Sequence, residues 1–386
     1  MIPVNEPALG DHEERYILEC LRSGWISSSG RFIDEFEAKW AAYCGMKYGI
    51  AVSNGTAALQ TAVACLGFEP GFRVIMPSFS IISCALAVIY NGGVPVLVDC
   101  DPNTWCMDVD QVRERIEKDR RHGSSSIKAI MPVHIYGHPV DMDPIMEMAR
   151  QYDLKVIEDA AEAHGAQYLS SRNASAPKWE KCGGFGHVST FSFYANKLIT
   201  TGEGGMVLTN DKKLAENARG LRNLCFCPEQ RFLHTELGHN FRLTNLQAAI
   251  GLAQLERIDE IIMRKRWMGN YYTERLHGVG GLQLPVEEPW ARQIYWMYGI
   301  VLDEKKGWDA KNFGEKLREQ GIDTRPFFLG MHEQPVFRNM SLFTDESYPV
   351  TERIARQGLY LPSGLTLTEE QISLVCNAVK EIVTNK

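Results

Sequence analysis

Lys197 stands between an apolar, aromatic run and a turn rich in threonine and glycine, in the stretch TFSFYANKLITTGEGGM at residues 190–206. Most lysines lie on solvated surfaces, so the residue type alone favours an ordinary surface position. At the end of a core strand the amine would instead be partly desolvated and would lose its proton more easily. Such an amine can attack a carbonyl group and form a Schiff base.

Gly55, Thr56 and Ala57 lie at an expected strand-to-helix junction in VSNGTAAL. Glycine lets the backbone turn sharply, and the free amides of the new helix carry a partial positive charge that suits a phosphate group. A helix start capped by Asn54 or Thr56 explains the same residues without a ligand. The motif alone does not decide between the two interpretations.

Glu158 and Asp159 directly follow an apolar strand in VIEDAAEAHG. Because ligands of parallel sheets bind at the carboxyl ends of strands, an acid there can pair with a cationic group of a ligand. A helix N-cap by Asp159 is the alternative. A phosphate site, a strand-end carboxylate and a strand-end lysine preceded by Ser192 follow one another along the chain, and an enzyme that uses pyridoxal phosphate needs these parts.

Strand-like and helix-like segments alternate through the first two-thirds of the chain, as in RVIMPSFS, VPVLVDC, MDPIMEMARQYD and VSTFSFY. This alternation predicts an α/β domain with a mainly parallel sheet. We expect a large domain at residues 1–255 and a smaller α+β domain at residues 256–386. One long amphipathic helix, from Asn245 to about Leu276, can bridge them. Residues 170–184 are expected to form a polar surface loop.

The composition is that of an ordinary globular protein, with 386 residues, 45% of them hydrophobic, and a formal net charge of -7. This acidic balance argues against a nucleic-acid partner. No window approaches about 18 uninterrupted apolar residues and the first residues lack the apolar core of a signal peptide, so we expect no membrane partner and a cytoplasmic location. The ten cysteines form no CxxC pair, and Cys225 and Cys227 lack a second ligand pair, so we expect reduced thiols and no metal.

Five segments together resemble one protein family: SNGTAAL, VHIYG, VIEDAAEAHGA, FSFYANKLITTGEGGMV and NFRLTNLQAAIGLAQLERID. From IPVNEP to LPSGLTLTEEQI the chain is similar to the sugar aminotransferases of the DegT/DnrJ/EryC1/StrS group. The resemblance implies the fold-type I architecture of aspartate aminotransferase, pyridoxal 5'-phosphate as cofactor, and a homodimer with shared active sites. GWISSSGRFIDEFE and GIDTRPFF look most like the members that make GDP-perosamine from GDP-4-keto-6-deoxymannose with L-glutamate as amino donor, in lipopolysaccharide O-antigen biosynthesis.

The resemblance also implies a role for each candidate site residue. Lys197 matches the lysine that binds the cofactor aldehyde and moves a proton to the sugar C4, Asp159 matches the acid that pairs with the pyridine nitrogen, and Glu162 matches a position near the ring. The phosphate contacts match Gly55, Thr56, Ala57 and Ser192, with Asn240 reaching the phosphate from the neighbouring subunit. The nucleotide-sugar contacts match Trp25, Ser27, Arg31, Arg325 and His332. A core position for Trp25 and a surface salt bridge for Arg325 are the structural alternatives.

Ile81 departs from the family pattern, because an aromatic residue that stacks on the cofactor ring usually occupies this position. Ile81 can still pack on the ring, but it has no π face. Ala195 replaces a glycine in YANK, which has a conformational cost only if that position needs a positive φ. Leu329 stands where the family often has His or Tyr, which bears on sugar specificity.

Three other functions, each known for a branch of proteins with this fold, are alternatives for this chain. A dehydratase branch carries histidine where this chain has Lys197, which favours transamination. A 3- or 4-aminotransferase that acts on a UDP- or dTDP-linked keto-deoxy sugar would use the same lysine chemistry, and the sequence does not exclude it. A pyridoxal-phosphate-sensing regulator of the same fold usually carries an added DNA-binding module, which does not fit this acidic chain.

Overall fold

A seven-stranded sheet lies at the centre of the computed structural model, which describes residues 1–121, 123, 125–171, 176–227, 229–230 and 232–384. The strand order is β1-β9-β8-β5-β4-β2-β3. In this sheet β9 runs antiparallel to β1 and β8, and the other neighbouring pairs are parallel. The predicted α/β fold with a mainly parallel sheet is therefore confirmed. The strands are β1 (Tyr48–Val52), β2 (Arg73–Pro77), β3 (Val94–Val98), β4 (Ile127–Ile130), β5 (Lys155–Asp159), β8 (Val188–Ser192) and β9 (Gly205–Thr209).

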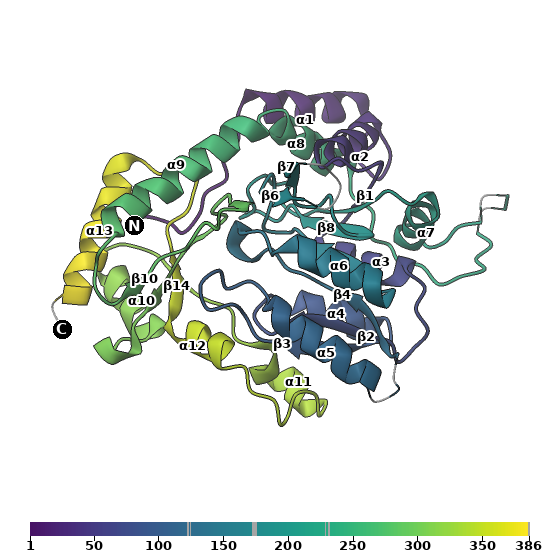
Figure 1. Cartoon of the computed structure of the whole chain (residues 1–386). Helices are drawn as coiled ribbons and strands as arrows, with labels where there is room; N and C mark the ends of the chain where they lie inside the picture. Colours follow the sequence, from purple (N-terminus) through teal and green to yellow (C-terminus); the bar gives the residue numbers. More distant parts are fainter. Residues whose placement is uncertain (122, 124, 172–175, 228, 231, 385–386) are drawn as a thin grey trace.

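Helices cover both faces of this sheet, as Figure 1 shows. Successive residues of a strand point to opposite faces, so Val74 and Met76 join an apolar cluster with α3, α4 and α7, whereas Ile75 joins one with α2, α5 and α6. Burial on both faces explains why these strands are apolar throughout. Within the described residues, no helix is long and apolar enough to cross a membrane. The helices of this part are α1 (Asp11–Ser23), α2 (Arg31–Tyr43), α3 (Gly55–Cys65), α4 (Ser83–Tyr90), α5 (Val109–Arg121), α6 (Met142–Tyr152) and α7 (Lys212–Arg222), with the short helix η1 (Ile135–Gly137).

A smaller antiparallel sheet, in the order β10-β12-β14-β13, lies in the C-terminal part of the chain beside the large one (Figure 1). Helices α9 (Ile258–Leu276), α10 and α13 contribute to its apolar core. The N-terminus also reaches this part, because the amide of Ile2 donates to the carbonyl of Gly321 at 2.7 Å. The strands are β10 (Leu282–Gln283), β12 (Tyr298–Leu302), β13 (Arg325–Pro326) and β14 (Gly358–Leu361), and the helices after α9 are η2 (Glu304–Lys306), α10 (Ala310–Glu319), η3 (Met331–Glu333), α11 (Pro335–Asn339), α12 (Pro349–Gln357) and α13 (Glu369–Thr384).

The single long helix expected from residue 245 to 276 is wrong, because the structure has two helices there, α8 (Asn245–Leu255) and α9 (Ile258–Leu276). At the break, Arg257 has φ -114° and ψ 10°, and its amide donates to the carbonyl of Gln254 at 3.1 Å. Side chains of α1 and α2 hold Glu256 at this point through hydrogen bonds. The apolar pattern continues through both helices, so periodicity alone could not show the break. We propose that the domain boundary after residue 255 lies here.

Residues 178–181 form a strand, which corrects the surface loop expected over residues 170–184. β7 (Lys178–Lys181) pairs with β6 (Gln167–Ser170), and β11 (Ala291–Arg292) adds a third strand. The strand is polar because it is only partly buried, and its Trp179 lies 4.1 Å from the guanidinium carbon of Arg292, measured from the ring centroid. The strand partner β6 is near in the sequence, but residues 178–181 lack the apolar pattern of a buried strand, so their composition gave no sign of it. Residues 172–175 of the expected loop lie outside the described residues.

Candidate active site

Asp159 is the last residue of β5, and it lines a cavity at the carboxyl end of that strand. Its carboxylate is buried and accepts hydrogen bonds from the amide of Ala161 at 3.0 Å and from the thiol of Cys84 at 3.2 Å. Burial raises the pKa of Asp159, although these bonds and the charge of Lys197 oppose the rise. A cationic ligand would stabilise such a carboxylate in its charged form.

Lys197 lies in the turn between β8 and β9 and lines the same cavity. Its Nζ lies 3.5 Å from Oε1 of Glu162 and 3.6 Å from the ring centroid of Trp296. Burial lowers the pKa of Lys197, and the charges of Glu162 and Asp159 offset only part of this effect. A lowered pKa increases the fraction of the amine that is neutral and can act as a nucleophile.

Glu162 is the second buried acid of the cavity. Its Oε2 accepts the amide of Tyr136 at 2.8 Å. Burial raises the pKa of Glu162 to about 7, although the charge of Lys197 opposes the rise. Tyr136 presents its amide from a left-handed backbone conformation with φ 50°, which is uncommon for a residue other than glycine. The backbone of the VHIYG motif thus holds Glu162 beside the lysine.

The start of α3 supplies backbone amides to this cavity. Asn54 caps the helix, since its Oδ1 accepts the amide of Ala57 at 2.8 Å, and the amides of Gly55 and Thr56 lie ahead of any carbonyl of the helix that could accept them. A Cβ on Gly55 would lie 2.7 Å from the Cβ of Ser192, so glycine is required where the helix starts against β8. The capped helix and the anion site are therefore compatible, and Asn54 supplies the cap.

The cavity has a volume of about 570 Å³. It offers helix amides for a phosphate, a buried carboxylate for a cation and a desolvated amine for a carbonyl group. Pyridoxal phosphate carries a phosphate, a ring nitrogen that can be cationic and an aldehyde carbonyl, so the residues present fit this cofactor. Ile81 lines the cavity with an aliphatic side chain that is 41% exposed. The other lining residues include Gly55, Thr56, Ala57, Asp159, Glu162, Ser192, Tyr194, Lys197, Trp296, Phe328 and Tyr360.

Six further residues expected at the site do not line this cavity in the described part of the chain. Arg31 is exposed and pairs with Glu19 and Glu35, and Arg325 is exposed and pairs with Asp323. The salt-bridge alternative for Arg325 is therefore present in this subunit. The six residues are Trp25, Ser27, Arg31, Asn240, Arg325 and His332.

The other four differ in their exposure. Trp25 is 58% exposed, which excludes the core position considered for it, and Ser27 is exposed as well. Asn240 is exposed, and its Oδ1 accepts a hydrogen bond from Nε of Arg242 at 2.8 Å. His332 is buried, and its Nε2 lies 3.2 Å from the carboxylate of Glu352. Only the exposed residues of this set are available to a ligand or a second subunit.

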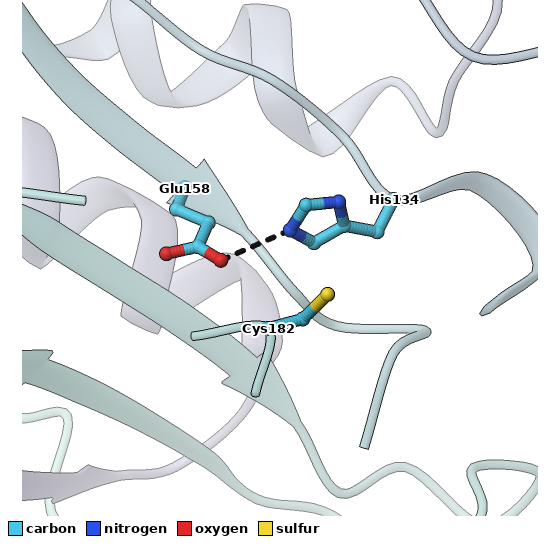
Figure 2. A group of neighbouring side chains, drawn as sticks. All are labelled: His134, Glu158 and Cys182. Carbon is cyan, nitrogen blue, oxygen red and sulfur yellow. Dashed lines mark hydrogen bonds and ion pairs between the residues drawn. The ribbon is translucent and has the colours of Figure 1, made fainter. Parts of the chain in front are cut away.

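Glu158 precedes Asp159 but points to the opposite face of the sheet. Figure 2 shows its carboxylate directed at the imidazole of His134, with Cys182 beside the pair. The three potential ligand atoms lie within 4.8 Å of one another, close enough for a metal ion. However, Nδ1 of His134 accepts the amide of Val140 at 2.9 Å, so the ring proton lies on Nε2, which donates to Glu158 at 3.0 Å. Because both ring nitrogens are used, we interpret this cluster as a structural hydrogen-bonded pair.

Sequence reasoning missed two residues that contact the predicted site residues, Cys84 and Trp296. Cys84 donates to Asp159, and the indole Nε1 of Trp296 donates to the carbonyl of Asn196 at 2.7 Å. Cys84 follows the PSFS segment closely, so its place near a strand end was a weak signal. Trp296 lies in the strand-like stretch IYWMYGIVL, where nothing distinguishes it from a core aromatic residue.

Comparisons with known proteins match nearly the whole chain. The DegT/DnrJ/EryC1/StrS aminotransferase family matches residues 7–380. The GDP-perosamine synthase of Caulobacter vibrioides is 42% identical over 99% of this chain and 98% of its own length. The GDP-perosamine synthase of Vibrio cholerae is 36% identical over 98% of both chains. Among solved structures, S. venezuelae DesV is 33% identical, with a TM-score of 0.86, and the match covers 96% of this chain and 94% of DesV.

Proposed function

The chain belongs to the DegT/DnrJ/EryC1/StrS aminotransferase family and is a pyridoxal phosphate-dependent transaminase, and we propose that it aminates C4 of a GDP-linked 4-keto-6-deoxy sugar. The observation that carries the choice of sugar is the full-length similarity to proteins named GDP-perosamine synthase. The sequence resemblance adds GDP-4-keto-6-deoxymannose as the best candidate substrate and L-glutamate as the amino donor. GDP-perosamine would then be the product.

Different residues of the cavity would bind different parts of the cofactor. When bound, pyridoxal phosphate supplies an aldehyde that carries the amino group and a ring that withdraws electrons from the reacting carbon. Gly55, Thr56 and Ala57, together with the hydroxyl of Ser192, would bind the phosphate group. Asp159 would pair with the ring nitrogen, because a positive charge there relieves the cost of burying this carboxylate. Ile81 would pack against the ring.

Lys197 would bind the cofactor through Nζ and then move a proton at that atom. Burial lowers its pKa, so Nζ can accept a proton from glutamate and return one to C4 of the sugar. Glu162 would help to hold the nitrogen in the cavity, since its Oε1 lies 3.5 Å from Nζ. The same atom therefore serves both half-reactions, with L-glutamate leaving as 2-oxoglutarate.

We also propose a homodimer with shared active sites. The motivating observation is Asn240, which is exposed and does not line the cavity of its own subunit in the described structure. An asparagine placed in this way can reach the phosphate site of a neighbouring subunit. Mixing Lys197→Ala with Asn240→Asp should restore part of the activity through hybrid dimers, because one site of the hybrid then holds both native residues. If subunit exchange is shown and no mixture gains activity, the shared site is disproved.

A panel of nucleotide sugars tests the proposed reaction. The purified protein is incubated with L-glutamate and with GDP-, UDP- or dTDP-linked 4-keto-6-deoxy sugars, and mass spectrometry follows the exchange of the keto oxygen for an amino group. We expect the amino sugar from the GDP substrate, with one 2-oxoglutarate formed for each amine transferred. Lys197→Ala should form none.

Three outcomes would overturn parts of this proposal. Product from only the UDP or dTDP sugars would contradict the choice of nucleotide. An amine at C3 of the product, located by nuclear magnetic resonance, would contradict 4-amination and favour the 3-aminotransferase. Turnover by Lys197→Ala at the native rate would contradict the role of Lys197.

A further inference from the structure

Trp296 connects the C-terminal part of the chain to the reactive lysine. Its side chain lines the cavity, although the residue is only 3% exposed. The indole Nε1 donates to the carbonyl of Asn196 at 2.7 Å, and this carbonyl immediately precedes Lys197. The face of the same ring lies over Nζ of Lys197, with 3.6 Å from the nitrogen to the ring centroid. One side chain thus contacts both the backbone and the amine of the lysine segment.

Lys265 of α9 holds the backbone of Trp296. Its ammonium donates to the carbonyl of Trp296 at 2.8 Å and also to the carbonyl of Ser363. Lys265 is only 2% exposed, and burial lowers its pKa to about 7. Both a charged and a neutral amine can donate to two carbonyls, so the contact does not depend on the charge. The hydroxyl of Ser363 in turn accepts the amide of Tyr298, which starts β12.

The side chain of Lys197 needs such support even though the backbone after it is held, since Thr200 and Thr201 both donate to the carbonyl of Phe193. Lys197 lies in a turn, where its amide donates to the carbonyl of Tyr194 at 2.9 Å. The side chain has four rotatable carbon bonds, and the contact of Nζ with Glu162 is 3.5 Å long. Without further contacts, a side chain of this length would sample positions away from the cofactor. A ring pressed against the nitrogen and a bond to the preceding carbonyl restrict that sampling.

We propose that Trp296 is a positioning residue for Lys197, and that Lys265 positions Trp296 through its carbonyl. This proposal rests on the role of Lys197 proposed above. The C-terminal part of the chain then sets the place of the reactive nitrogen, although the large sheet carries the lysine. The ring also stabilises positive charge on that nitrogen, because a cation over an indole face is attracted to the ring.

Three substitutions separate these contributions. Trp296→Phe keeps a ring face but removes the indole N–H, and Trp296→Leu removes both. Trp105→Phe is the matched control, because Trp105 and Trp296 are both 3% exposed and both pack on Tyr136, at 6.4 and 6.1 Å between ring centroids. In the described part of the chain, Nε1 of Trp105 has no hydrogen-bond partner and its ring does not line the cavity. Circular dichroism and thermal melting establish that each variant is folded.

The expected result is a loss of kcat without a change in KM. Trp296→Phe should lower kcat about fivefold, because a fivefold change in rate corresponds to the net contribution of about one hydrogen bond. Trp296→Leu should lower kcat about tenfold or more and should lower the pH midpoint of the visible absorption band of the cofactor-loaded protein by about half a unit. The other titratable groups around the nitrogen, which are Cys84, Asp159, Glu162 and His164, are unchanged in all variants. Trp105→Phe should match the native protein in both measurements.

Several outcomes would overturn the proposal. If both Trp296 variants keep the native kcat and the native pH midpoint, Trp296 does not position the lysine. If KM rises while kcat is kept, Trp296 is a sugar contact instead. Lys265→Gln keeps the indole side chain but removes the amine that holds the Trp296 carbonyl, and it should lower kcat in the same direction. Native kcat in that folded variant would remove Lys265 from the proposal. A native protein with neither a visible band nor amine transfer would contradict the proposed function and not this inference.

Discussion

Glu158 and Asp159 are adjacent carboxylates at the end of one strand, and they lie in opposite environments on the two faces of the sheet. Both are buried. Asp159 accepts hydrogen bonds from the amide of Ala161 and the thiol of Cys84. Glu158 accepts hydrogen bonds from a larger set of groups, which are the His134 ring, the amides of Gly183, Phe185 and Gly186, and the Ser189 hydroxyl.

The difference shows in the direction of the two pKa shifts. Burial would raise both pKa values, but the donors around Glu158 outweigh burial and lower its pKa, whereas burial prevails at Asp159 and raises its pKa. A carboxylate with all its acceptor sites used has no capacity left for a ligand, and its role is to hold neighbouring segments together. A carboxylate with spare capacity, facing a cavity, is the one that a cationic ligand stabilises.

Asp159→Asn is the strongest test of the cavity side of this comparison. The amide cannot compensate a positive ring nitrogen, so we expect kcat to fall by roughly 10² to 10⁴. The free energy of unfolding of the cofactor-free protein should stay the same or increase, because a buried charge with few donors is removed. Steady-state kinetics and urea unfolding measure the two effects. A kcat within a few fold of the native value would show that Asp159 is not the partner of the ring nitrogen.

Glu158→Gln tests the opposite face and should have the reverse profile. The substitution leaves several buried amides and the His134 ring with a neutral partner of poorer geometry, so we expect the free energy of unfolding to fall by roughly 3 kcal/mol. The folded fraction should keep a kcat close to the native value, since Glu158 does not line the cavity in the described structure. Urea unfolding, with kinetics on the folded protein, measures both. A loss of kcat without a loss of stability would contradict a purely structural role for Glu158.

Glu162 is the other buried acid that lines the cavity, and its contribution to the free energy of unfolding depends on pH. Its pKa is raised from 4.5 to about 7, so the folded protein holds a proton that the unfolded chain has lost within this range. Stability from this group is therefore fully present below pH 4.5 and is lost as pH rises through about 7. Glu162→Gln removes that loss. Between pH 4.5 and about 7, the free energy of unfolding of the variant should therefore rise relative to that of the native protein by roughly 1.4 kcal/mol per pH unit. Urea unfolding of both cofactor-free proteins across this range checks the slope, and parallel curves would show that Glu162 is not held in a raised-pKa state.

Several residues that the sequence singled out line one cavity in the structure, and the family resemblance carried most of that prediction. Lys197 follows a core strand and Gly55 starts a helix, but local sequence left a surface lysine and a simple helix cap open, and the family motifs SNGTAAL and FSFYANKLITTGEGGMV singled them out. The two acids were both visible at the strand end, but alternation shows only that they lie on opposite faces, and not which face holds the cavity. The hydrogen bonds that distinguish them come from residues 134 and 183–189, which the fold brings together.

The residues that sequence reasoning missed depend on contacts between distant segments. Trp296 and Lys265 come from the C-terminal part of the chain, and their patterns are those of a core strand and an amphipathic helix. The break at Arg257 was missed for the same reason, since side chains of α1 and α2 hold Glu256 there. The strand at residues 178–181 was missed because it is polar and only partly buried, although its partner β6 is near in the sequence. Trp25, Ser27, Arg31 and Arg325, which were expected to serve the nucleotide sugar, lie on the surface, where a second subunit or the substrate would complete their surroundings, whereas His332 is buried.

The smallest expected effect concerns Cys182, beside the His134–Glu158 pair in Figure 2. A metal at this cluster would need a lone pair on His134, but one ring nitrogen accepts the amide of Val140 and the other carries the proton donated to Glu158. We therefore expect a chelator to leave the melting temperature unchanged, and Cys182→Ala to lower the free energy of unfolding by about 1 kcal/mol through lost packing alone. The decisive measurement is the melting temperature of both proteins with and without chelator. A drop in the native protein that Cys182→Ala abolishes would mean that the cluster binds a metal, and Glu158 would then no longer be the saturated acid of the pair.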